Sequence, residues 1–119
     1  MGNNEINCDC NVIHFDLVEK AKKSILNKDE LLKISNFYKA MSDSTRVRII
    51  NILQNNELCV CDISSILNMT KSAVSHQLKY LKERNLIKCI RKGKEIWYSL
   101  SDCHVEQVFE ISLQHIREK

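Results

Sequence analysis

The feature that most constrains the fold is a short helical pattern, a tight turn and a longer helical pattern over residues 60–85. The first reads VCDISSILN, the turn reads NMT, and the second reads KSAVSHQLKYLKERN. Thr70 is a residue type that caps helix N-termini. The apolar residues that recur with helical period, and that we expect to point inward, are Ile63, Ile66, Leu67, Val74, Leu78 and Leu81. This layout predicts a helix-turn-helix, whose second helix enters the major groove of DNA.

The residues that follow predict a β-hairpin. LIKCIRKGKEIWYSL consists of two β-rich runs around Gly93, which supplies the positive φ that a tight turn needs. A hairpin placed after such a helix is a wing. Helical periodicity predicts four further helices: over residues 14–28, behind Asp29, behind Ser42 or Asp43 (the buried centre), and from Ser101–Asp102. The expected fold is therefore mainly α with a small β-hairpin wing, a winged helix-turn-helix.

The chain has 119 residues, which suits a single domain. We expect residues 1–13 to form a flexible tail and residues 14–119 to form the folded domain. No apolar run approaches the roughly 18 residues of a membrane span. The N-terminal MGNNEINCDC lacks the basic and then apolar layout of a secretion signal, which favours a cytoplasmic location.

Six cysteines are present, and four of them form two Cys-x-Cys pairs, CDC at residues 8–10 and CVC at residues 59–61. In a reducing compartment these are expected to be free thiols, and clustered thiols there indicate metal binding or redox chemistry. Cys89 stands alone in a strand-like run, where a small buried apolar residue is the simpler interpretation.

Basic residues are concentrated in one part of the chain. Residues 71–94 hold eight lysines and arginines and one acidic residue, Glu83, although the whole chain has a net charge of only +3. A solvated helix face would mix the two signs more evenly. The block is typical of a surface that binds phosphates.

The outward face of the second helix and the wing tip are the predicted DNA contacts. Short hydroxyls suit close approach to DNA, His and Gln reach base edges, and lysines neutralise phosphates. The predicted contacts are Lys71, Ser72, Ser75, His76, Gln77, Lys79, Arg91, Lys92 and Lys94. The same fold can serve protein contacts alone, but the basic block favours double-stranded DNA as the partner.

The pair Cys59 and Cys61 has the geometry of a metal site only at a helix start. Side chains at i and i+2 within a helix point about 200° apart, but an extended Cys59 lets both thiols turn to one side. Two thiolates rarely satisfy a divalent ion, and Cys8 and Cys10 in the tail offer two more. Four soft thiolates favour Cd(II), Pb(II) or Zn(II) over hard ions.

The last helix suggests a second site. His104 and His115 fall on nearly one face but about 16 Å apart along the axis, too far for one ion. Two such helices packed antiparallel across a two-fold axis would bring Asp102 and His104 to His115 and Glu118 of the second copy. These oxygen and nitrogen ligands suit Zn(II) or Co(II). Isolated charged residues on a solvated dimer helix are the alternative.

The segment ELCVCDISSILNMTKSAVSHQLKYLKERNLIKCIRKGKEIWYSL resembles the ArsR/SmtB family of metal-responsive winged-helix repressors. The similarity is greatest to its CadC-type branch, which senses cadmium, lead and zinc, and it extends from about residue 29 to the end of the chain. The resemblance implies a homodimer that represses a metal-efflux gene from an operator and leaves when metal binds. It implies no small organic substrate.

The resemblance also implies ligand sets. In the thiol-type sensors of the family the tail cysteines reach the helix-turn-helix pair of the partner, which here implies Cys8, Cys10, Cys59 and Cys61. The C-terminal pattern DxH…HxxE matches Asp102, His104, His115 and Glu118, a site for Zn(II). His14 is a substitute or additional ligand, and Cys103 is either an extra ligand or a plain surface thiol.

Three other functions fit parts of the sequence. A repressor that responds to thiol oxidation or persulfide formation would keep the fold and change the signal. An enzyme is not expected, because the chain lacks Cys-x-x-Cys, a Gly-rich phosphate loop, His-Glu-x-x-His and a nucleophile elbow. A passive metal buffer would not require the basic block.

Overall fold

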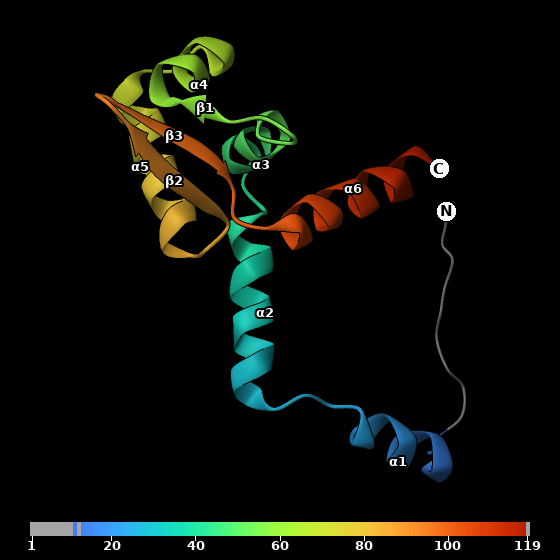
Figure 1. Ribbon diagram of the computed structural model, residues 1–119. Helices are drawn as coiled ribbons and strands as arrows, with labels where there is room; N and C mark the ends of the chain where they lie inside the picture. The colour runs from blue at the N-terminus through green and yellow to red at the C-terminus, as the bar shows by residue number, and fades with distance from the viewer. Residues whose placement is uncertain (1–10, 12, 119) are drawn as a thin grey trace. The chain divides into compact units, whose positions relative to one another are not determined.

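The computed structural model describes residues 11 and 13–118 (Figure 1). It divides into two compact units, which meet between Leu32 and Lys33. The elements are, in order, α1 Phe15–Lys23, α2 Lys28–Ala40, α3 Ser44–Ile52, β1 Leu58–Cys59, α4 Val60–Leu67, α5 Lys71–Glu83, β2 Ile87–Lys92, β3 Glu95–Leu100 and α6 Cys103–Arg117. No helix in the described ranges has the length and apolar character of a membrane span.

The first unit contains α1 and the start of α2. The helix predicted over residues 14–28 is shorter than expected, because α1 ends at Lys23 and the Ser24 hydroxyl donates to the Ala21 carbonyl at 2.8 Å. The expected cap of the next helix was also wrong. The Asn27 side chain, not Asp29, accepts the Glu30 backbone N–H at 2.8 Å.

The core of the second unit forms around α3 and α5. Ile49 and Ile50 of α3 are fully buried, as expected of the predicted central helix. On α5 the three residues predicted to point inward, Val74, Leu78 and Leu81, are also fully buried. Burial of this kind contributes about 1.5–3 kcal/mol for each large apolar side chain, so these contacts hold the recognition helix to the domain.

The two helices of the helix-turn-helix are held by their caps. Asn68 ends α4 with φ 55°, a left-handed conformation that Asn tolerates. The Thr70 side chain then accepts the Ala73 backbone N–H at 3.1 Å and begins α5, as the sequence predicted. Ile66 was expected to point inward, but 53% of it is exposed because it lies on the outer side of the short helix α4.

The hairpin is part of a three-stranded antiparallel sheet with the order β1-β3-β2. Gly93 turns the chain between β2 and β3 with φ 64°, as predicted. The short strand β1 was not predicted. It pairs Leu58 with Tyr98 and Cys59 with Trp97, and so joins the segment before α4 to the wing.

We expect Leu78→Ala to lower the free energy of unfolding by about 2–5 kcal/mol, because it leaves a cavity beneath α5. The matched change Ile66→Ala removes a largely exposed side chain and should cost about 1 kcal/mol or less. Urea unfolding followed by circular dichroism at one protein concentration measures both. Equal losses would contradict the placement of α5 on this core.

Candidate nucleic-acid interface and metal ligands

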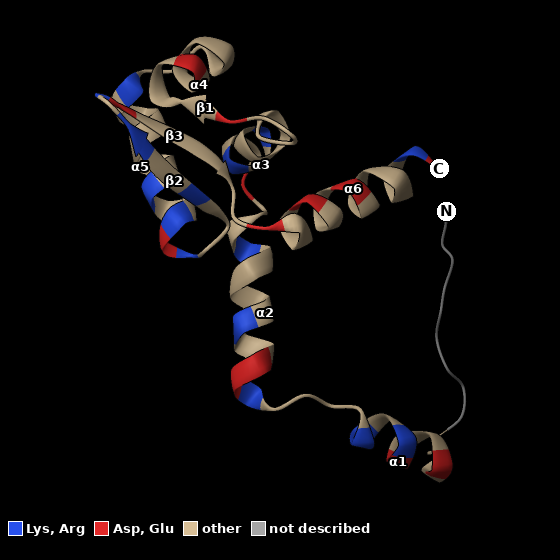
Figure 2. Cartoon of the chain, in the orientation of Figure 1, with Lys and Arg blue, Asp and Glu red and all other residues tan. Residues whose placement is uncertain are grey.

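The predicted base-reading residues lie on the outer side of α5. Lys71, Ser72, Ser75, His76 and Lys79 are exposed, and Gln77 is half-buried. The period of the helix makes this arrangement a direct consequence of burying the apolar face. Figure 2 shows lysine and arginine along α5, β2 and the turn of the hairpin. The exposed surface of these elements is therefore positively charged.

The three basic residues of the wing are exposed but differ in their contacts. The Arg91 guanidinium donates to the Gly93 carbonyl at 3.2 Å. The Lys92 ammonium lies 2.7 Å from the Glu57 carboxylate, 35 residues away in the sequence, and 5.3 Å from the centre of the Trp97 ring. Lys92 is thus held by an acidic residue that precedes β1, a contact that the sequence did not reveal.

The end of α5 is anchored by an aromatic side chain between helices. The guanidinium carbons of Arg46 and Arg84 lie 4.2 and 3.5 Å from the centre of the Tyr80 ring. Arg46 also donates to the Ala40 carbonyl at 2.6 Å. Cation–π contacts of this kind add to the apolar burial and tie α5 to α3 and to the end of α2.

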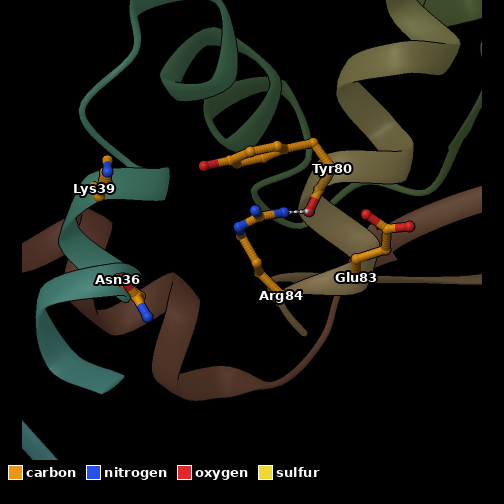
Figure 3. Close-up of a pocket in the computed structure, with 5 residues that line it drawn as sticks. All are labelled: Asn36, Lys39, Tyr80, Glu83 and Arg84. Atoms are coloured by element: carbon orange, nitrogen blue, oxygen red, sulfur yellow. Dashed lines mark hydrogen bonds between the residues drawn. The ribbon is translucent and has the colours of Figure 1, made fainter. Parts of the chain in front are cut away.

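Figure 3 shows the pocket beside this anchor, lined by Asn36, Lys39, Tyr80, Glu83 and Arg84. Arg84 donates to the Tyr80 carbonyl at 3.2 Å. The spacing of Tyr80 and Arg84, four residues apart on one helix, is the signal that would have indicated this pair from the sequence.

The thiol pair lies where β1 becomes α4. Cys59 is extended, with φ −91° and ψ 172°, as predicted for a pair at a helix start. The Asp62 carboxylate accepts the Cys59 backbone N–H at 3.1 Å and helps to fix this turn. Cys59 is half-buried and Cys61 is exposed, and both are free thiols. The predicted ligands Cys8 and Cys10 lie outside the described residues.

The C-terminal ligand candidates lie at opposite ends of α6. Asp102 caps the helix by accepting the backbone N–H groups of His104 and Val105 at 3.0 and 3.2 Å. Its other carboxylate oxygen is 3.7 Å from His104 Nδ1. His115 and Glu118 are exposed at the far end. Within residues 11 and 13–118 of one chain, no three His, Cys, Asp or Glu side chains are grouped to hold an ion.

The other candidate ligands are isolated. Cys103 is exposed in the first turn of α6, and His14 is exposed where α1 begins. Cys89 is half-buried opposite Tyr98 in the sheet. Burial raises the pKa of the Tyr98 phenol, Cys89 adds to the rise and Lys82 opposes it, so the phenol is neutral at physiological pH.

Together the capped helix pair, the hairpin and the basic surface define a winged helix-turn-helix DNA-binding protein. The model of the bacterial regulatory protein family arsR matches residues 43–88. A cadmium resistance transcriptional regulatory protein CadC homolog of Staphylococcus aureus is 40% identical over 93% of this chain and 92% of its own length. A transcriptional repressor SmtB homolog of Synechocystis is 33% identical over 93% of this chain and 84% of its own.

The fold agrees with that relationship. The solution structure of apo-NmtR has a TM-score of 0.70 and 31% identity, and the match covers 81% of each chain. The chain belongs to the ArsR/SmtB family of transcriptional repressors. The predicted family and the predicted fold are thereby confirmed.

We expect Glu57→Gln to raise the affinity for duplex DNA from upstream of the protein's own gene about two- to fivefold, because it frees Lys92 to bind a phosphate. Fluorescence anisotropy measures this change. Glu110→Gln on α6 removes the same charge away from the wing and should have little effect. The gain should disappear in a Lys92→Gln background, and a gain that persists there would contradict the explanation.

Proposed function

We propose that the protein is a metal-sensing transcriptional repressor that binds operator DNA as a homodimer. Binding of Cd(II), Pb(II) or Zn(II) releases the DNA and derepresses a metal-efflux or resistance gene. The observation that carries this proposal is the position of Cys59, which is at once a residue of β1 and the residue before α4. A ligand there is attached to both DNA-binding parts of the fold.

The thiol site takes Cys59 and Cys61 from the helix-turn-helix pair and Cys8 and Cys10 from the tail. Exposure of Cys61 leaves one thiol accessible to an ion and to further ligands. Thiolate sulfur is the donor that these soft metals prefer. The relationship to a CadC homolog supports the same choice of metals.

The homodimer is supported by the apolar face of α6. A groove of about 410 Å³ lies between α6 and the segment from Tyr38 to Val47, and its lining includes Phe109, Leu113 and Ile116. Ile111 and Ile116 are 64% and 66% exposed in the single chain. We assign this face to α6 of the second copy, which would bury these side chains.

The dimer also completes the second metal site. Asp102 and His104 would meet His115 and Glu118 of the other copy, which gives two symmetric oxygen and nitrogen sites suited to Zn(II). Asp102 already caps α6, so metal binding there would compete with the cap. Metal at this site would change how the two copies are set, whereas metal at the thiol site would act on α4 and β1.

In either case metal must bind the DNA-free form more tightly than the DNA-bound form. A coupling free energy of about 1–3 kcal/mol lowers operator affinity roughly 5- to 150-fold. We assign the control of release to the thiol site, because β1 and α4 connect it directly to the wing and to α5.

The exposed thiol Cys61 supports a second candidate, a repressor that responds to thiol oxidation or persulfide formation. Reduced protein separates the two. A sulfur-to-metal charge-transfer band that saturates with Cd(II), together with release of DNA under reducing conditions, supports the metal sensor. Release that requires an oxidant or a persulfide, with no response to Cd(II), supports the redox sensor.

We expect Cys59→Ser dimers to keep their DNA in the presence of Cd(II), because one thiolate ligand is lost. His104→Ala dimers should still release it. Anisotropy titrations with and without Cd(II), under reducing conditions, measure both, with Cys103→Ser as the matched thiol control. Normal release by the Cys59 variant would show that the thiol site is not the trigger.

We expect Ile116→Glu to shift the protein from dimer toward monomer, because a carboxylate would be buried in the contact between two copies of α6. Sedimentation velocity across a concentration series measures the shift. Ile90→Glu is the control, since Ile90 is 53% exposed on β2, away from α6. A variant that dimerises like the parent would remove α6 from the interface.

A further inference from the structure

A small cavity brings the thiol pair to the DNA-binding surface. It has a volume of about 340 Å³, and Cys59 and Cys61 line it together with Ser75, Lys94 and Glu95. Ser75 belongs to the base-reading face of α5. Lys94 follows Gly93 in the turn of the wing. One cavity therefore joins the two thiols to a predicted DNA contact on each side.

Hydrogen bonding and helix geometry hold the cavity in place. The pairing of Cys59 with Trp97 joins one wall to β3, and the apolar face of α5 joins the other to the core. The Tyr98 side chain closes the base and is neutral at physiological pH. The ionisable groups that line the cavity are the two thiols, Tyr98, Lys94 and Glu95.

The charge of this cavity depends on the state of the thiols. A cysteine thiol has an ordinary pKa of about 8.5 and is mostly neutral at physiological pH, whereas a metal ligand is a thiolate. Metal binding releases the proton to solvent. A divalent ion held by four thiolates carries a net charge of −2, so the complex would place negative charge beside Lys94 and the path of the DNA phosphates.

We propose that this cavity transmits the state of Cys59 and Cys61 to DNA as charge. Negative charge fixed on the pair repels the phosphate backbone between α5 and the wing and attracts the Lys94 ammonium away from it. The metal as the natural source of that charge rests on the proposed function. The effect of the charge itself requires only that the protein binds DNA through these two elements.

The test uses two isosteric side chains in the full-length, metal-free protein. Cys61→Asp places a carboxylate at the exposed position, and Cys61→Asn places a neutral amide of the same size. Duplex DNA from upstream of the protein's own gene is titrated by anisotropy with a chelator present. We expect Cys61→Asp to bind about tenfold more weakly than Cys61→Asn at low salt, with a smaller difference at high salt.

Cys103→Asp and Cys103→Asn make the same comparison on α6 and should agree within about twofold. Equal affinities for the two Cys61 variants would overturn the proposal, as would a difference as large at Cys103. Circular dichroism establishes that each variant is folded.

Alkylation provides a second comparison without a new backbone. In protein with the other four cysteines changed to serine, each thiolate displaces iodide from iodoacetamide or iodoacetate, forming a sulfur–carbon bond and releasing its proton to buffer. The neutral and anionic adducts are nearly isosteric, and only the anionic one should weaken binding strongly.

Equal effects of the two adducts would overturn the proposal. If the charge comparisons fail while Cd(II) still releases DNA, release operates through a conformational change and the proposed function stands. If they succeed while Cd(II) has no effect, the cavity senses charge but metal is not its source.

Discussion

The packing of α5 against the core is the interaction on which the rest of the structure depends. Val74, Leu78 and Leu81 are fully buried, so the opposite side of the helix must face solvent. That side carries Ser75 and His76 with the lysines of the recognition surface. One apolar face therefore provides both the stability of the helix-turn-helix and the orientation of the residues that face DNA.

The second constraint is the short strand β1. It places Cys59 opposite Trp97, so the thiol pair belongs to the sheet of the wing as well as to the start of α4. A change in the ligands of Cys59 is felt by both parts without a long chain of contacts. The bond between Lys92 and Glu57 lies on the same side of the fold and adds a charge contact between the wing and the approach to β1.

The C-terminal helix illustrates how one sequence can encode a site that a single chain does not contain. Asp102 and His104 begin α6, and His115 and Glu118 lie near its end. The helix keeps the two halves about 16 Å apart, the rise of eleven residues. Such a pair of half-sites has a use only where a second copy is antiparallel, and the exposed Ile116 on the same helix is consistent with that arrangement.

Local patterns in the sequence determined the helices of the helix-turn-helix, the Thr70 cap and the turn at Gly93, because helix period, capping and positive φ act over a few residues. They failed at Ile66, where a short helix leaves part of its apolar surface outside. Only the tertiary structure decided that Cys59 pairs with Trp97 and that the thiols share a cavity with Lys94. Those neighbours are more than thirty residues apart, and no local period specifies which distant segments meet when the sheet closes on the core.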